Sequence, residues 1–296
     1  MKILVTAAGG NQSRRLIPKL SAMGHQVRAV RVSGDKEAET RALGASEVLI
    51  GDLTDVDFYT RALEGCDAVY HIGPAGRWTE LEMGHSMIEA ARRCRTPHVV
   101  FSSVLHSIID IVQHRFKRDI EEKLYESGLP YTVLKPCDFM IPAMQFGPVL
   151  ATGELRVFWK VREGRRGSLI DVEDLTDVAA KVLVEGSRHF YASYELSGTD
   201  KLTSREMARI FSRVMGKEIP VVQSNVDEAI AHRWGSSEIT PQNQGIHRVL
   251  TSIAAWYSDH EFVGNSNILE WFLGRKPITF EQYLRRELPL LGVPVT

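Results

Sequence analysis

The sequence is poor in cysteine and has no long apolar run. Its three cysteines, Cys66, Cys94 and Cys137, are odd in number and show no CxxC spacing. This argues against a disulfide framework and against a zinc site, and favours a reducing compartment. No apolar stretch approaches the roughly 18 residues that cross a bilayer, and no signal-peptide pattern precedes the first strand pattern,. We therefore expect a cytoplasmic protein that does not enter a membrane and holds no structural metal.

An excess of charge of one sign is also missing. Lys and Arg total 36 and Asp and Glu total 37, for a formal net charge of -1. A balanced chain has no whole-molecule attraction to a phosphate backbone, so we expect no direct binding of nucleic acid. The 44% of apolar and 25% of charged residues are ordinary for a globular protein,. The partners that remain are a small-molecule substrate or a regulatory protein, with a homodimer also open.

The first half of the chain alternates short apolar runs with helical periodicity. Six such runs are each followed by a crossover of helix length, and parallel strands need crossovers of that length. The pattern predicts an α/β fold with a doubly wound parallel sheet of the Rossmann type, whose ligands bind at the carboxyl ends of the strands. The predicted strands are residues 3–5, 27–30, 47–50, 68–72, 98–101 and 131–134, and the predicted helices are residues 12–23, 37–43, 56–63, 79–94 and 112–127.

The alternation stops near residue 136. The chain then becomes interrupted by proline and glycine, with an extended run at 155–161. We predict an NAD(P)-binding Rossmann domain over 1–135 and a smaller α+β substrate-binding lobe over 136–296, from which segments can return to the Rossmann sheet. Amphipathic helices are predicted in the lobe at residues 175–185, 204–215, 226–231, 246–257 and 280–287, the last started by Thr279,.

The loop after the first predicted strand, residues 6–12, reads TAAGGNQ. A dinucleotide fingerprint uses glycines there for a tight turn and for close approach to the pyrophosphate, which rests on the following helix N-terminus. Ala7 and Ser13 stand where glycines are expected, so only Gly9 and Gly10 can take a positive φ without cost. We predict a phosphate loop, with an ordinary turn as the alternative. Its predicted cofactor contacts are Thr6, Ala8, Gly10, Asn11 and Gln12.

Residues at the ends of the later strands predict which nucleotide binds. Arg31 follows the second strand, where an acidic residue would bind the ribose of NAD and an arginine accommodates the 2′-phosphate of NADP. We therefore predict NADP(H), with NAD(H) less favoured; a solvated arginine is the alternative. Asp52 and Leu53 are predicted to line the adenine pocket, although Asp52 can equally cap the next helix. Further along, Gly73, Pro74 and Pro136 follow or end strands and are predicted to face the cofactor.

Several stretches in one order carry a family resemblance. They are the loop TAAGGNQ, the run AVYHIGP at 68–74, the strand end FSSVLH at 101–106, the segment from His114 to Met140, SLIDVEDL at 168–175 and LEWFLGRKP at 269–277. With these motifs the chain resembles the NmrA-like family of atypical short-chain dehydrogenases/reductases, over nearly its whole length. The resemblance implies a preference for NADP(H), a Rossmann domain with a small substrate lobe, and either reductase activity or nucleotide-sensing regulation.

The catalytic tyrosine of ordinary short-chain dehydrogenases is missing. That tyrosine stands four residues before a lysine, and here Gln113 stands four residues before Lys117. The resemblance suggests that Lys117 keeps the contact with the nicotinamide ribose and that His114 takes the nearby polar position. Three residues apart on one helix, both can reach one pocket, and the lysine would lower the pKa of His114 below about 6.5. The alternatives are a structural His114 and a solvated Lys117.

Three more residues complete the predicted site. Ser103 follows the fifth strand and matches the dehydrogenase serine, and its hydroxyl is predicted to polarise a substrate carbonyl or to contact the nicotinamide ribose. Phe139 and Met140, after the sixth strand, are predicted to form the substrate wall, with a place in the apolar core as the alternative.

Two functions follow from these features. The first is an NADP(H)-dependent oxidoreductase that reduces a small carbonyl or conjugated substrate, with Lys117, His114 and Ser103 as catalytic residues. The second is a non-catalytic protein that senses NADP and acts through a protein partner. The missing tyrosine favours this second function.

Overall fold

The computed structural model describes residues 1–74, 79–161 and 165–296. The chain divides into two compact units. The first contains Met1–Ile109, Gln113–Pro136 and Leu175–Glu195, and the second contains Asp110–Val112, Cys137–Asp174 and Leu196–Thr296. A segment from the middle of the chain therefore completes the first unit. No helix in the described residues is both long enough and apolar enough to span a membrane.

A seven-stranded sheet forms the centre of the first unit. The strands lie in the order β10-β6-β5-β4-β1-β2-β3, and the pairs among β1 to β6 are parallel. Ile3, Leu4 and Val5 have no exposed surface, because helices cover both faces of such a sheet,. The reversal of strand order between β1 and β4 makes the sheet doubly wound, as predicted. The strands are β1 (Lys2–Val5), β2 (Gln26–Arg31), β3 (Glu47–Ile50), β4 (Ala68–Ile72), β5 (Val99–Ser102), β6 (Tyr131–Pro136) and β10 (Ala192–Leu196).

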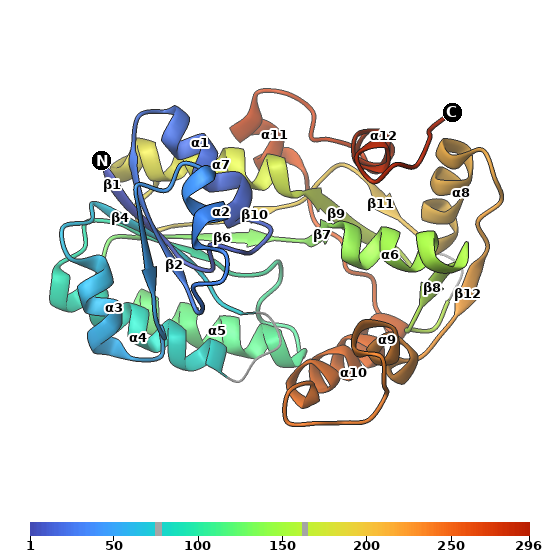
Figure 1. Cartoon of the computed structure of the whole chain (residues 1–296), viewed down its shortest axis with the longest axis horizontal. Helices are drawn as coiled ribbons and strands as arrows, with labels where there is room; N and C mark the ends of the chain where they lie inside the picture. The colour runs from blue at the N-terminus through green and yellow to red at the C-terminus, as the bar shows by residue number, and fades with distance from the viewer. Residues whose placement is uncertain (75–78, 162–164) are drawn as a thin grey trace. The chain divides into compact units, whose positions relative to one another are not determined.

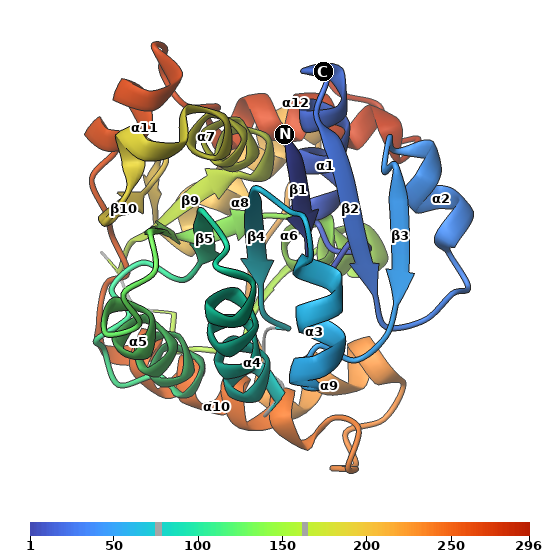
Figure 2. The same cartoon turned by 90° about the vertical axis from the view of Figure 1, so that its left-hand side faces the viewer.

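Helices cover the two faces of this sheet (Figures 1 and 2). On one face lie α1 and α7, joined by a 2.5 Å contact between Lys19 Nζ and Asp177 Oδ1, and on the other lie α3, α4 and α5. Gly84 lets α4 approach α5 closely, because a Cβ there would lie 2.4 Å from the Ile120 side chain. The helices of this unit are α1 (Ser13–Ala22), α2 (Glu37–Ala42), α3 (Val56–Leu63), α4 (Thr79–Cys94), α5 (Val112–Tyr125), α7 (Val172–Glu185) and the 3-10 helix η1 (Gly186–His189).

The second unit has its own small sheets and apolar core. Met140, Leu169 and Phe211 are among the buried residues that pack together there with residues of α8 and α12. The strands are β7 (Asp138–Met140), β9 (Gly167–Asp171) and β11 (Lys201–Leu202) in one sheet, and β8 (Leu155–Val157) and β12 (Val221–Gln223) in another. The helices are α6 (Pro142–Thr152), α8 (Ser204–Met215), α9 (Val226–Trp234), α10 (Gln244–Asp259), α11 (Asn267–Leu273) and α12 (Phe280–Leu290).

Several features differ from the sequence-based expectation, which also did not include the strands β7, β9, β10, β11 and β12. The extended run predicted at 155–161 forms a strand only over Leu155–Val157. The helix predicted from 175 begins at Val172, since Asp171 caps it by accepting the backbone N–H of Glu173 at 2.7 Å. The prediction missed α6, which contains two prolines, and α11, which has only seven residues. Its expectation for Thr279 is confirmed, because this residue forms a reciprocal capping box with Gln282 at the start of α12.

Candidate functional site

The loop between β1 and α1 reaches its turn in an unexpected way. Ala7, not a glycine, takes a positive φ of 48°, and neither Gly9 nor Gly10 has a left-handed backbone. The two glycines that could take a positive φ without cost therefore do not use it. Both positions are crowded: a Cβ on Gly9 would lie 3.0 Å from the movable Arg31 Nη1, and one on Gly10 would lie 3.1 Å from the backbone carbonyl oxygen of Ala7. In this loop the glycines thus matter because neighbouring atoms come close to them, and not because of an unusual backbone conformation.

Side chains of the loop anchor it to the sheet. Thr6 accepts the backbone N–H of Ile72 at 2.8 Å through its hydroxyl, and its carbonyl accepts the hydroxyl of Ser13 at 2.7 Å. Gln12 Oε1 accepts the Tyr70 hydroxyl at 2.6 Å and the Ser102 hydroxyl at 3.1 Å. Thr6 and Gln12 were predicted as cofactor contacts; the structure shows that their side-chain oxygens hold the loop against β4 and β5.

Backbone donors of the loop are left without partners. Among the residues that the structure describes, the backbone N–H groups of Gly9, Asn11, Gln12 and Ser13 donate no hydrogen bond. They stand at the N-terminus of α1, where the helix dipole favours negative charge. The side chain of Asn11 is exposed beside them. This arrangement is suited to a phosphate group, whose oxygens can accept several N–H bonds together.

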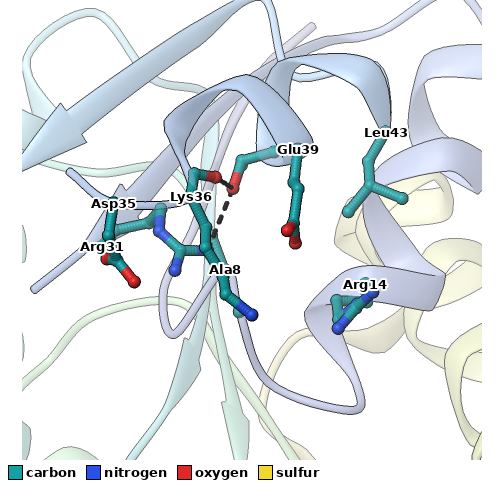
Figure 3. A pocket seen from close by; sticks show the side chains of 9 residues that line it. Ala8, Arg14, Arg31, Asp35, Lys36, Glu39 and Leu43 are labelled. Atoms are coloured by element: carbon teal, nitrogen blue, oxygen red, sulfur yellow. Dashed lines mark hydrogen bonds between the residues drawn. The ribbon is translucent and has the colours of Figure 1, made fainter. Parts of the chain in front are cut away.

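A cavity of about 280 Å³ continues from this loop to α2. Arg31 reaches it from the end of β2 and donates to Thr40 Oγ1 at 3.1 Å. Figure 3 shows the side chains of Lys36 and Glu39 pointing toward Ala8 and Arg14. The complete lining is Ala8, Gly9, Arg14, Arg31, Asp35, Lys36, Glu39, Thr40 and Leu43.

The charges of the cavity favour an anion. Arg14, Arg31 and Lys36 supply three cations against the carboxylates of Asp35 and Glu39. The hydroxyl of Ser33, which donates to Asp35, lowers the pKa of that carboxyl, with smaller contributions from Arg31 and Lys36. Even with both carboxylates ionised, the cavity keeps one net positive charge.

Arg14 was missed by the sequence-based prediction. It lies one residue into α1, whose first turn holds no acidic residue. Helix N-termini favour acidic side chains, so a cation in that turn is electrostatically unfavourable unless an anion binds there. The arginine in the first turn of this helix was therefore the feature of the sequence that could have indicated an anion site.

The predicted adenine-pocket residues have structural contacts. Asp52 is exposed and accepts the backbone N–H of Thr54 at 2.9 Å, whereas Asp55 caps α3. Leu53 is 4% exposed and packs in the apolar core of the first unit. Neither residue lines the cavity beside Arg31.

Glycine at position 73 makes room for a residue that the prediction did not consider. A Cβ on Gly73 would lie 2.9 Å from Glu80 Cγ and Oε1. Pro74 follows, half-buried. Pro136 ends β6, is buried, and accepts the backbone N–H of Leu105 at 2.8 Å through its carbonyl.

Lys117 is held inside the first unit by two polar contacts. Its Nζ lies 2.7 Å from Glu80 Oε1 and donates to the carbonyl of Ser102 at 3.0 Å. It also lies 5.1 Å from the centre of the Phe101 ring. An ammonium has three N–H donors; among the described residues one is donated to Ser102 and the charge is paired with Glu80, so donor capacity remains, and the side chain keeps 11% exposure. Ser102 links this lysine to the phosphate loop, because its hydroxyl donates to Gln12.

His114 is buried and held in one tautomer. Burial lowers the pKa of His114 to about 4, and the neighbouring charge of Lys117 adds a smaller effect in the predicted direction. Its Nδ1 lies 3.1 Å from the carbonyl oxygen of His106. A carbonyl only accepts, so Nδ1 carries the proton and Nε2 carries a lone pair. Near pH 7 the ring is therefore neutral, and it has no proton at Nε2 to donate.

Ser103 is occupied by a second buried carboxylate. Its hydroxyl donates to Glu121, which also accepts the hydroxyl of Ser107 at 3.1 Å and lies 2.7 Å from Lys135 Nζ. The proton that Ser103 was predicted to offer a substrate is thus used inside the protein.

The two predicted substrate residues lie on β7 of the second unit. Met140 is 1% exposed and belongs to the apolar core of that unit, the alternative left open by its sequence context. Phe139 is half-buried and pairs in register with Ile170 of β9.

Three buried histidines predict how stability depends on pH. Burial lowers the pKa of His71 to about 3 and those of His98 and His114 to about 4, from 6.5. The unfolded chain therefore takes up protons first. Their contribution is complete above pH 6.5 and is lost as the pH falls toward 4, by roughly 1.4 kcal/mol per pH unit for each histidine.

Urea unfolding at pH 7, 6 and 5 measures this dependence. The variant His98→Gln should reduce the slope of unfolding free energy against pH by one histidine's share. The matched change His232→Gln, at an exposed position, should leave the slope unaltered. Equal slopes for His98→Gln and the unmodified chain would contradict the assignment.

Comparison with known proteins agrees with this geometry. The model of the NmrA-like family matches residues 1–284. A relative from Streptomyces griseus, (4-alkanoyl-5-oxo-2,5-dihydrofuran-3-yl)methyl phosphate reductase, is 28% identical over 233 residues, which cover 77% of this chain and 78% of the relative.

Two solved structures have the same fold. Triphenylmethane reductase of Citrobacter sp. in complex with NADP(H) is 18% identical, with a TM-score of 0.79 over 97% of this chain and 99% of its own. NmrA, a negative transcriptional regulator, in complex with NADP is also 18% identical, with a TM-score of 0.79 over 98% of this chain and 96% of its own. With the family model matched over nearly its full length, this chain belongs to the NmrA-like family.

Proposed function

We propose that this protein is an NADP(H)-dependent oxidoreductase that reduces a small carbonyl or conjugated substrate. The observation that carries the proposal is Lys117: a buried ammonium with unused donor capacity, connected through Ser102 to the phosphate loop. A lysine so constrained can hold a ribose hydroxyl or a developing oxyanion in a fixed direction. The named reductases among its relatives support the same class of activity.

The residues present fit NADP(H). The unpaired N–H groups of residues 9 and 11–13 suit the pyrophosphate,. The cavity beside them, with Arg14, Arg31 and Lys36, suits the phosphate that distinguishes NADP from NAD,. When bound, this cofactor supplies a hydride. The protein supplies the binding, the orientation and the charge that stabilises the product.

The state of His114 favours one group of substrates. A simple ketone becomes a strongly basic alkoxide on reduction and needs an acid close by. His114, with its pKa lowered to about 4 and Nε2 unprotonated, does not supply one near pH 7. A conjugated acceptor leaves a delocalised anion that a fixed cation such as Lys117 can stabilise until solvent protonates it. We therefore place conjugated carbonyls and quinone-like acceptors ahead of simple ketones.

The second candidate is a non-catalytic protein that senses NADP through a protein partner. It is favoured by the missing tyrosine, with Gln113 in its place, and by the likeness to the regulator NmrA. A sensor needs the phosphate loop and the Arg31 cavity but makes no use of the remaining donor capacity of Lys117.

Two measurements separate the candidates. Fluorescence titration gives the affinities for NADPH and NADP⁺, and absorbance at the reduced nicotinamide band follows turnover with a panel of quinones, enones and simple ketones. We expect tight NADPH binding, and turnover fastest with conjugated acceptors. Binding without turnover of any acceptor would favour the sensor, and absence of binding would contradict both candidates.

A further inference from the structure

Glu80 is a fully buried carboxylate in the first turn of α4. Its side chain has no exposed surface, and its Oε1 lies 2.7 Å from Lys117 Nζ. Among residues 1–74, 79–161 and 165–296, no donor makes an aligned hydrogen bond to either oxygen. The carboxylate fits beneath the end of β4 because position 73 is a glycine, where a Cβ would lie 2.9 Å from it. Glu80 therefore faces Lys117 as its counter-charge and makes little other polar contact.

This pairing is costly to maintain for stability alone. Each charge loses its hydration on burial, and apolar residues of similar volume would often stabilise the fold as well or better. The pair does, however, fix the position of the Lys117 ammonium. A lysine ammonium sits on a flexible four-carbon stem and has no fixed fork of donors. Here the ion pair with Glu80 and the hydrogen bond to the Ser102 carbonyl constrain the ammonium from two sides, and so determine the direction of the N–H that remains for a ligand.

We propose that Glu80 is a positioning residue for the reductase reaction, which aims the free N–H of Lys117 at the cofactor ribose or the substrate oxygen. The inference rests on the proposed reductase function. Glu80 itself is closed to solvent, so it acts through Lys117 and does not touch substrate. Replacing the Glu80 carboxylate by a neutral amide removes one of the two contacts that fix the Lys117 ammonium. The remaining N–H is then no longer directed at the ligand.

A double-mutant cycle tests this role. Glu80→Gln is made in the unmodified protein and in Lys117→Met, and kcat/KM is measured with NADPH and the best acceptor. We expect a loss of about tenfold in the first background and less than about twofold in the second, the signature of residues that act together. Glu80→Asp keeps the charge and should restore part of the activity. Glu82→Gln, an exposed position on the same helix, is the matched control and should behave as the unmodified protein.

The outcomes are distinct. Equal losses in both backgrounds would show that Glu80 only supports the fold, and would overturn the proposal. If Glu80→Gln does not fold, as judged by circular dichroism, the cycle is run with Glu80→Asp, which keeps the charge but is one methylene shorter and so draws the carboxylate away from Lys117; a partial loss confined to the background that contains Lys117 supports the role, and equal losses in both backgrounds overturn it. An unmodified protein that turns over no acceptor would overturn the reductase function, and this inference with it, before any variant is compared.

Discussion

Replacement of Arg31 by alanine is expected to weaken NADPH binding and to leave NADH binding unchanged. The guanidinium lines the cavity beside the loop and is oriented by Thr40 and Ser33. A hydrogen bond to a charged group contributes about 1.5 to 3 kcal/mol, which corresponds to a rise in Kd of roughly 10- to 150-fold. NADH has no phosphate at this position, so its Kd should stay within about twofold. Fluorescence titration with both reduced cofactors measures the two values.

The controls for Arg31 distinguish local recognition from general charge. Arg41→Ala removes a cation from α2 that pairs with Glu37 outside the cavity, and should alter neither Kd. Arg14→Ala should weaken NADPH binding in the same direction as Arg31→Ala. Equal losses of NADPH and NADH affinity in Arg31→Ala would mean that this residue supports the loop and does not recognise the additional phosphate.

Replacement of Lys117 by methionine should cause the largest loss of activity. Removal of a preorganised donor to a developing oxyanion typically lowers kcat by about 10²- to 10³-fold. The same change leaves the carboxylate of Glu80 buried without its partner, which costs about 3 to 5 kcal/mol of stability. Activity and thermal unfolding are therefore measured on the same preparation.

A second variant separates these two effects of Lys117. In Lys117→Met with Glu80→Gln, no unpaired charge is buried, so most of the lost stability should return while turnover stays low. Lys123→Met, on the exposed face of the same helix, should retain full turnover. Turnover close to that of the unmodified protein in either variant without Lys117 would remove this lysine from the mechanism and shift weight to the sensor.

The fold of the first unit was open to prediction because its signals are local. The strands β1 to β6 follow short apolar runs, and the helices between them follow a 3.6-residue period, both of which depend on neighbours in the sequence,. The edge strand β10 and the proline-containing α6 escaped prediction for the same reason. β10 reads ASYEL with a single buried residue, so it lacks the apolar run that marks β1 to β6, and α6 carries a proline, Pro148, inside the helix,.

Some residues of the candidate site could be predicted from local sequence patterns, and others became evident only in the folded structure. Periodicity, turn residues and motif order in the chain itself were enough for a Rossmann sheet, for the loop at residues 6–12 and for Arg31 and Lys117 as residues of interest. Folding added the partners. Glu80 meets Lys117, Glu121 takes the hydroxyl of Ser103, and Arg14 joins the cavity of Arg31, in each case across helices and strands that are distant in sequence. Such contacts depend on how helices and strands pack, because a buried charge or hydroxyl needs a polar partner and pairs with one that the packing brings close. Local sequence patterns do not contain the identity of that partner.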